Sequence, residues 1–547
     1  MKSVGGIKLP PIGAFALAIL MGLPILWLLG AGLFAATGGG GGLSSSMLPT
    51  ALRETAMLMA SVGVTTGIIG LVAAWLVTHF EFPGRRVFEW ALMLPIAVPT
   101  YLAAYAYTEF LDFTGPVQQG LRALIGATTI KQYWFPAIKS PGGAVLVFSL
   151  VLYPYVYAAC RSFFLMQSGS VGLAARVLGA NGWRSFFEIT LPLSRPALAV
   201  GMTLAMMEVV NDLGAVQYFG INSLTAVIYS TWINRNNFGG AAQLAVTIVL
   251  IIGLLILIEQ WGRRNRAYGA SGENRVPPAR VTLAPRAALG ASLFSLSLLL
   301  AGFAVPFGVL ATLALRNIGV GEIDLAFDAG TTSLGLGLLG AAFTVTLGFV
   351  AARLGSRHAR PTARQAIRFA TLGYAIPGTV LALGLLQPLG QIDLAVNRVT
   401  MALMEWKPGL ILSGSVAALL YVYAIRFLAV SASTLDAAMK KRGDTLLDAG
   451  RVLGVSGARL LVLVDLPSLS PALITAATLV FVEIVKELPA TLLLRPLGLE
   501  TLASVVYGKA SAGLFAEAAL PALLIVVVGL VPVMLATRYS DGRRKAG

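Results

Sequence analysis

The chain has 547 residues, of which 57% are hydrophobic and only 12% are charged. Soluble globular chains carry about 25% charged residues, so this composition excludes a set of soluble domains with polar surfaces. The formal net charge of +16 would suit a nucleic-acid-binding protein only if the basic residues formed one patch, and their positions decide against it.

Hydropathy predicts twelve membrane-spanning helices, because apolar runs recur that reach the roughly 20 helical residues needed to cross a bilayer. In the first half the runs lie near 14–36, 55–79, 87–110, 143–165, 196–216 and 241–261. In the second half they lie near 290–314, 333–354, 369–389, 409–432, 470–492 and 517–537. The first run is too long for a signal peptide, so we expect an anchor. The fold class predicted is an all-α membrane protein.

Most of the 40 Lys and Arg residues fall at the two termini and in alternate loops, with the densest clusters around Arg263, Arg357 and Lys441. This asymmetry follows the positive-inside rule and does not form a nucleic-acid patch. An even number of spans then places both termini in the cytoplasm. We predict a multi-pass protein of the bacterial inner membrane that contacts the lipid bilayer and no nucleic acid.

Cysteine and histidine are scarce. Cys160 is the single cysteine, which excludes an intramolecular disulfide and a multi-cysteine metal site, and we interpret it as a packing residue. His79 and His358 lie near the cytoplasmic ends of spans, and the sequence has no metal-ligand spacing or nucleophile motif. A membrane enzyme is therefore not favoured.

The two halves of the chain repeat each other. RVLGANGWRSFFEITLPLSRPAL at 176–198 aligns without a gap with RVLGVSGARLLVLVDLPSLSPAL at 451–473, so Arg176 recurs as Arg451. We predict two parallel six-helix repeats, 1–270 and 289–547, joined by a basic cytoplasmic linker at 271–288. A parallel repeat implies a pseudo-twofold axis along the membrane normal, with a pathway between the halves.

Each repeated segment is a cytoplasmic loop after the fourth span of its half. Its pattern predicts a short helix, a glycine break, a second helix and a Leu-Pro stop before the next span. Gly179 and Gly454 can take positive φ where a helical turn ends. Pro192 and Pro467 can terminate the second helix. Duplication for stability alone would not explain why the closest similarity falls in this loop.

The loop resembles the cytoplasmic-loop signature of ABC importer permeases: Glu-Ala-Ala, three residues, Gly, nine residues, Ile, one residue, Leu-Pro. The first copy reads Leu173, Ala174, Ala175, Gly179, Ile189, Leu191 and Pro192, and the second reads Asp448, Ala449, Gly450, Gly454, Val464, Leu466 and Pro467. Leu173 replaces the usual acid, so no acid-dependent contact is expected there. Gly450 replaces the second alanine.

The resemblance implies the type I ABC importer permease fold, in which the first helix of the loop docks in a groove of a separate ATPase subunit. Two loops in one chain would seat two copies of that subunit. The sequence has no GxxxxGK[ST] phosphate loop, so we expect no enzymatic activity and no cofactor on this chain, with ATP and Mg on the partner ATPase. The alternative is that the loop helices merely join spans.

A second repeated feature is a pair of acids beyond each loop. MEVVNDLGA from Met207 and VEIVKELPA from Val482 align in the same register as the loops, so the acids of the first half, Glu208 and Asp212, match Glu483 and Glu487. The i, i+4 spacing puts both carboxylates of a helix on one face. By the rise of an α-helix, Glu208 lies roughly 18 Å beyond Pro196, past the bilayer midplane.

Acids inside a bilayer mark pathways or paired sites. We therefore predict all four acids as translocation-pathway candidates, with Glu208 and Glu483 as transient ligands of a hard cation. The alternative is that they form internal ion pairs, with Lys486, Arg161 or Arg426 as partners, or that they reach water at the outer interface.

Longer stretches point to a solute. EVVNDLGAVQYFGINSLTAVIYSTW, GGAAQLA after it, and KELPATLLLRPLGLETLA look like the fused iron(III) permeases of ABC importers, a likeness that spans most of the chain. It implies ferric ion delivered by a periplasmic solute-binding protein. Permeases for thiamine, polyamines, sulfate, molybdate and phosphonates share the loop and layout, so these solutes stay open. An ion-driven secondary transporter also fits twelve spans and intramembrane acids, but the paired loops speak against it.

Overall fold

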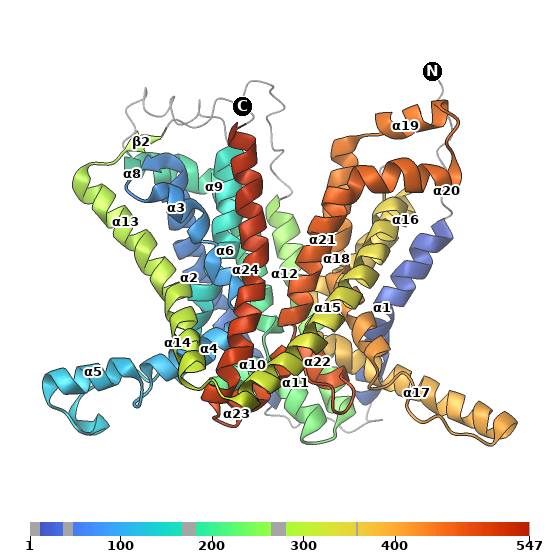
Figure 1. Ribbon diagram of the computed structural model, residues 1–547, viewed down its shortest axis with the longest axis horizontal. Coiled ribbons are helices and arrows are strands. Elements are labelled where there is room, and N and C mark those ends of the chain that lie inside the picture. Colours follow the sequence, from blue (N-terminus) through green and yellow to red (C-terminus); the bar gives the residue numbers. More distant parts are fainter. Residues whose placement is uncertain (1–10, 37–46, 167–181, 264–279, 357–358, 546–547) are drawn as a thin grey trace. The chain divides into compact units, whose positions relative to one another are not determined.

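The computed structural model describes residues 11–36, 47–166, 182–263, 280–356 and 359–545 (Figure 1). Among these, the regular elements are helices except for two two-residue strands, β1 (Phe80–Glu81) and β2 (Val281–Thr282), which pair in parallel. Eleven described helices are long and apolar enough to cross a membrane, and a bent pair makes up to twelve. The predicted all-α membrane fold with about twelve spans is confirmed.

Two predicted spans are interrupted. The region predicted as 87–110 consists of α3 (Arg85–Ala91), η2 (Leu94–Ala97) and α4 (Thr100–Leu111), and its two arms are bent by 94°. The region predicted as 369–389 consists of the end of α16 (Pro361–Ala370), η6 (Thr371–Ala375) and the start of α17 (Gly378–Met404). Pro99 and Pro377 precede α4 and α17, and a proline disfavours helical geometry in the residue before it. Continuous helices in these two places were therefore a wrong prediction.

One compact unit is formed within residues 1–42, 231–246 and 323–507. Its main helices are α1 (Pro11–Phe34), α15 (Val320–Leu354), α16, α17, α18 (Val416–Arg442), α19 (Thr445–Val452), α20 (Gly457–Leu460), η7 (Leu461–Asp465), α21 (Leu466–Lys486), α22 (Pro489–Leu494) and the first part of α23 (Leu502–Ser511). Although α1 comes from the first repeat, it packs on α16 and α17. Gly22 allows close approach, because a Cβ there would lie 2.6 Å from the Phe369 ring.

The other compact unit is formed within residues 43–230, 247–322 and 508–547. Its helices are α2 (Met47–His79), α3, α4, α5 (Pro116–Ile125), α6 (Pro141–Met166), α8 (Gly182–Ser185), η4 (Phe186–Thr190), α9 (Leu191–Asn211), α10 (Gly214–Tyr218), most of α11 (Leu224–Ile233), the later part of α12 (Phe238–Arg263), α13 (Pro285–Leu299), η5 (Leu300–Ala304), α14 (Val305–Arg316) and α24 (Phe515–Lys545). Here α13 and α14, from the second repeat, pack on helices of the first.

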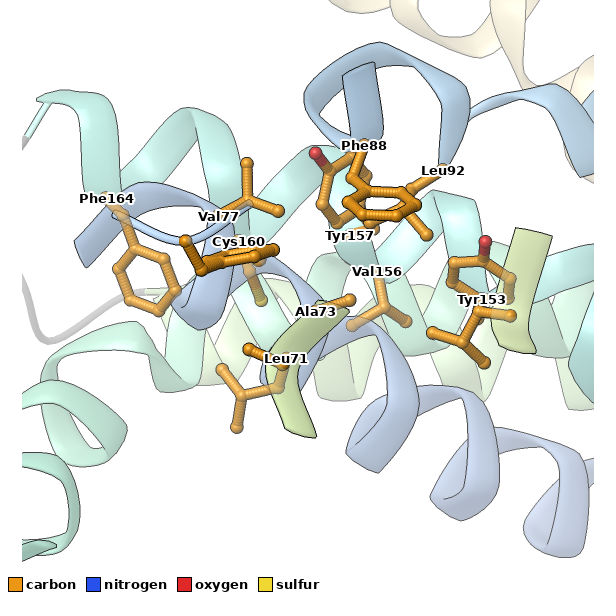
Figure 2. Packing of buried hydrophobic residues seen from close by; sticks show 14 of the residues in the cluster. Leu71, Ala73, Val77, Phe88, Leu92, Tyr153, Val156, Tyr157, Cys160 and Phe164 are labelled. Carbon is orange, nitrogen blue, oxygen red and sulfur yellow. The ribbon is translucent and has the colours of Figure 1, made fainter. Parts of the chain in front are cut away.

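Close helix contact builds the core of this second unit (Figure 2). A Cβ on Gly70 of α2 would lie 2.6 Å from the Val156 side chain, and a Cβ on Gly201 of α9 would lie 2.5 Å from its Cα. Small residues that let backbones approach are the usual means of helix packing in lipid. Cys160 is fully buried in this cluster, which confirms the packing role predicted for it.

The compact units thus differ from the sequence repeats. Each unit keeps the second to fifth spans of one repeat and gains the first span of the other. In a bilayer, helices form individually and then associate by packing, so a first span can pack on either repeat. The ranges 1–270, 271–288 and 289–547 stay a prediction about the duplicated sequence.

A hydrogen bond between a backbone N–H and a distant side-chain hydroxyl, which we call the tether, occurs at equivalent positions in both units. The Leu224 N–H donates to the Thr55 hydroxyl at 2.9 Å, and the Leu502 N–H donates to the Ser333 hydroxyl at 2.8 Å. In each tether the donor and the acceptor lie 169 positions apart in the chain. Thr55 and Leu224 of the first repeat therefore correspond to Ser333 and Leu502 of the second. The duplication is visible in three dimensions as well as in sequence.

Candidate coupling elbow and intramembrane acids

The second copy of the repeated loop forms an elbow, residues 443–465, that lies beyond the ends of α18 and α21 (Figure 1). Its first helix, α19, ends at Val452, and Gly454 follows with φ of +83°. The Gly454 N–H donates to Arg451 O and the Val455 N–H to Gly450 O, both at 3.0 Å. This is a Schellman motif, which confirms the glycine break predicted at Gly454.

The α19 helix has one buried and one exposed face. Leu447 and Gly450 are buried, and a Cβ on Gly450 would lie 2.8 Å from the Leu460 side chain. The glycine that departs from the family pattern therefore lets α19 lie close to α20. Val452 and Leu453 are 87% and 82% exposed. Two adjacent apolar side chains stand free at the tip of the elbow.

The predicted Leu-Pro stop is wrong. From Gly457 to Lys486 the chain is helical without a gap, and Pro467 lies in the first turn of α21. The turn before it, η7, is a π-helix in which the Leu466 N–H donates to Leu461 O. This wider turn accommodates a proline, which has no N–H and would clash with the carbonyl four residues earlier in a regular α-helix.

The first loop follows the same course where it is described. Ile189 lies in the π-helix η4, and the Leu191 N–H donates to Phe186 O before Pro192 enters α9. Leu173, Ala174, Ala175 and Gly179 lie outside the described residues. The coupling role of both loops stays a prediction.

Asp212 and Glu487 occupy equivalent breaks. Each follows the last residue of its span, α9 or α21, and accepts a hydrogen bond from a backbone N–H in the first turn of the next short helix. For Asp212 the donor is Ala215 at 2.7 Å, and for Glu487 the donors are Ala490 and Thr491, both at 2.9 Å. The carboxylates thus satisfy backbone groups that would otherwise lack partners.

The second partner of each acid differs between the units. Asp212 accepts a hydrogen bond from the Thr100 hydroxyl at the start of α4. Glu487 pairs instead with Arg426, whose Nη1 lies 3.1 Å from Oε1. Gly378, at the start of α17, makes room for this guanidinium, because a Cβ there would collide with it. Both acids thus accept a hydrogen bond from a neutral hydroxyl, which for Glu487 is that of Thr491 at 2.6 Å, and Glu487 adds a buried ion pair.

Glu483 is also paired, with its Oε1 2.9 Å from Lys486 Nζ. Of the three cations weighed as partners, Lys486 and Arg426 pair with acids of the second repeat, whereas Arg161 pairs with Glu89. Glu208 is half-buried on α9. Among the described residues, no group of three or more His, Cys, Asp or Glu side chains could hold a metal ion. The pathway and ligand roles of the four acids stay predictions.

Sequence reasoning missed one acid. Asp465, between Val464 and Leu466 of the signature, is fully buried and forms ion pairs with Arg353 and Arg442. The signal was an isolated acid in the apolar stretch VLVDLP. Its partners lie on two other spans, so no sequence spacing could have identified them.

Comparison with known proteins decides the family. The family model of binding-protein-dependent transport system inner membrane components matches twice, at residues 66–264 and 344–546. The chain belongs to this family. It is therefore a permease of the ABC importer type, built from two repeats. Both matches begin inside the second span of a repeat. They leave out the first span of each repeat, which packs on helices of the other repeat.

Among individual relatives, the Fe(3+)-transport system permease protein FbpB 2 of Haemophilus influenzae is 24% identical over 541 residues, which cover 97% of this chain and 99% of that protein. The molybdenum transport system permease protein ModB of Escherichia coli is 29% identical over 35% of this chain and 83% of its own length. The sulfate transport system permease protein CysW of Escherichia coli is 30% identical over 40% of this chain and 75% of its own length.

The helix breaks at Asp212 and Glu487 give a prediction about stability. We expect Glu487→Gln to lower the free energy of unfolding by about 3–5 kcal/mol, because Arg426 is left as an uncompensated buried charge. We expect Asp212→Asn to cost about 1–3 kcal/mol, because it weakens hydrogen bonds only. Thermal unfolding of the purified permease in nanodiscs measures both changes.

The matched control is the double variant Glu487→Gln with Arg426→Met, which removes both charges. It should recover most of the stability lost by Glu487→Gln alone. Equal losses for the two single variants would contradict the assignment.

Proposed function

We propose that this permease moves ferric ion from a periplasmic binding protein to the cytoplasm, powered by ATP hydrolysis on separate subunits. The observation that carries the proposal is the relative named for Fe(3+) transport, which aligns over nearly the whole of both chains. The molybdenum and sulfate permeases align with only part of this chain. The fused, two-repeat architecture is thus shared with the iron permease.

Charge and contact support a cytoplasmic elbow and N-terminus. Lys440, Lys441 and Arg442 end α18 immediately before the elbow, as the positive-inside rule requires of a cytoplasmic end. Gly13, near the start of α1, would place a Cβ 3.5 Å from Leu354 at the end of α15. Arg353 precedes that residue and contacts the elbow through Asp465. These contacts support an N-terminus on the elbow side, and in this proposal twelve spans bring the C-terminus to the same side.

The elbow supplies a docking surface for the ATPase. Val452 and Leu453 form an exposed apolar tip on a helix of eight residues, which suits a helix-in-groove contact. We propose that each of the two loops seats one ATPase subunit, which carries ATP and Mg. In this proposal the permease itself holds no cofactor.

A second candidate solute is an oxyanion, which the molybdenum and sulfate relatives favour. Ion pairing supports it as well. Glu483 and Glu487 both lie against cations, so the second repeat is less anionic than its acids alone suggest. Ferric ion remains our proposal because of the full-length relative. The acids then ease the passage of a hard cation, with Glu208 and Glu483 as transient ligands.

Uptake by proteoliposomes tests the solute. With the permease, its ATPase and its binding protein reconstituted, we expect ATP-dependent entry of labelled ferric ion. Excess molybdate, sulfate, spermidine or thiamine should not compete, because the binding protein selects the solute before the permease meets it. Entry of molybdate or sulfate without entry of iron would overturn the iron assignment in favour of the second candidate.

Substitutions at the elbow tip test the docking surface. We expect Val452→Ser with Leu453→Ser to weaken ATPase binding to the permease at least tenfold, because each apolar side chain loses about 1–2 kcal/mol of burial. Binding of the ATPase to permease nanodiscs measures this. The control is Leu497→Ser, a fully exposed leucine in the turn after α22, which should bind as wild type does. Unchanged binding by the double variant would contradict the docking role.

The pathway acids have their own test. We expect Glu208→Gln with Glu483→Gln to lower the rate of iron uptake by tenfold or more, because neutral amides bind a hard cation poorly. ATPase binding should be unaffected. Glu405→Gln, which changes an exposed acid at the end of α17, serves as the control. Wild-type uptake by the double variant would show that these acids do not handle the solute.

A further inference from the structure

Asp465 connects three spans at the base of the elbow. Its carboxylate is completely buried, at the last position of η7 before α21. Arg442, the last residue of α18, donates a hydrogen bond to Oδ1. Arg353, near the end of α15, places Nη1 2.9 Å from Oδ2. One acid therefore contacts cations from two other membrane helices.

The Arg442 contact closes the elbow on itself. Arg442 directly precedes the elbow and Asp465 is its last residue, 23 positions later. Arg442 also donates to the Ser468 hydroxyl at 2.7 Å, and that hydroxyl donates to Asp465 O at 2.7 Å. The two ends of the elbow are thus held together by a charged, hydrogen-bonded network that is largely protected from water.

The first repeat lacks this acid. In the gapless alignment of the two loops, Thr190 takes the position of Asp465, and it is buried. In the register that the repeated tether sets, where Thr55 corresponds to Ser333, Trp75 takes the position of Arg353. The Trp75 ring packs on Phe186 of η4, with centroids 4.6 Å apart. The same turn is thus joined to its neighbouring span by aromatic rings in one unit and by ions in the other.

We propose that Asp465 is a positioning residue that couples the second elbow to the membrane spans. The inference rests on the proposed importer function. With both ends tied at Asp465, a displacement of α19 cannot be absorbed by independent movement of α18 and α21. The Arg353 contact passes the same displacement to α15. An elbow whose two ends are joined by Arg442 and Asp465, and which is bound to α15 by Arg353, moves as one rigid body. Without these contacts the elbow bends at its glycines, Gly443, Gly454 and Gly457, which all have positive φ.

The test compares transport with ATP hydrolysis in the reconstituted complex. We expect Asp465→Asn, which keeps the side-chain shape and removes the charge, to lower solute uptake per ATP hydrolysed at least tenfold. ATPase subunits should remain bound, because Val452 and Leu453 are untouched. Asp465→Glu, which restores the charge, should recover part of the ratio. Wild-type coupling in Asp465→Asn would overturn the proposal.

Two controls separate positioning from general damage. Asp436→Asn removes an exposed ion pair with Lys440 in the last turns of α18, and Thr190→Val changes the equivalent position of the first repeat. Both should keep the uptake ratio within twofold of wild type. A loss of the same size in either variant would contradict a specific role for Asp465.

A second variant covers the case in which Asp465→Asn fails to assemble. Arg353→Gln removes only the ion pair between Asp465 and α15, at a side chain that is one-third exposed. We expect it to lower solute uptake per ATP hydrolysed severalfold. If Asp465→Asn loses its ATPase subunits while Arg353→Gln transports normally, the acid serves assembly and the proposal is wrong.

A distance measurement needs no solute. Spin labels at Thr445→Cys, an exposed position of α19 outside the apolar tip, and at Val350→Cys on α15, with Cys160→Ala, should give a narrow distance distribution that broadens in Asp465→Asn. An unchanged distribution would overturn the inference even if the complex transports. Broadening in a complex that imports no solute would instead count against the proposed function. It would still support the role of Asp465 in holding the elbow to α15 and α18.

Discussion

A helix that breaks inside a bilayer leaves backbone N–H and C=O groups without water, and each group must find a partner within the protein. The arrangement of this permease follows from how its breaks meet that constraint. Where α9 and α21 end, Asp212 and Glu487 accept hydrogen bonds from the next helix. These acids therefore have a structural task that does not depend on any solute. Backbone hydrogen bonding is enough to explain why acids occur at these two positions in the membrane, without reference to a transport pathway.

The backbone groups next to Pro192 and Pro467 find their hydrogen-bond partners in another way. Pro192 and Pro467 follow π-helical turns whose carbonyls find donors five residues later instead of four. The helix can then continue from the loop into the span without a gap. A rigid connection of this kind suits the coupling role that we propose for the elbow, and a true stop would have placed a hinge there.

The two repeats keep one backbone plan and change the side chains that support it. Thr100 beside Asp212 becomes Gly378 and Arg426 beside Glu487. Trp75 on Phe186 becomes Arg353 on Asp465. In both pairs the second repeat uses a cationic partner, Arg426 or Arg353, where the first uses a neutral one. Buried ion pairs are costly to break and depend on geometry, so the two halves of a duplicated permease need not respond equally to the same movement.

The sequence by itself determined the membrane environment, the number of spans, the duplication and the glycine break at Gly454. These features depend on composition, apolar run length and local backbone preference, which neighbouring residues define. It also supplied the family, through spacing within one loop. Lys486 and Arg426 were recognised as partners for acids because few cations occur inside spans.

Only the tertiary structure decided which helices pack together. Apolar spans look alike in sequence, so nothing in α1 or α13 indicates that each packs on the opposite repeat. The continuous helix through Pro467 depended on hydrogen bonds of a π-helical turn that compete with the local preference of proline. Asp465 needed partners from α15 and α18, two spans that precede it in the chain and are separated from it by other elements. Contacts between distant spans arise from packing in lipid, and no sequence period encodes them.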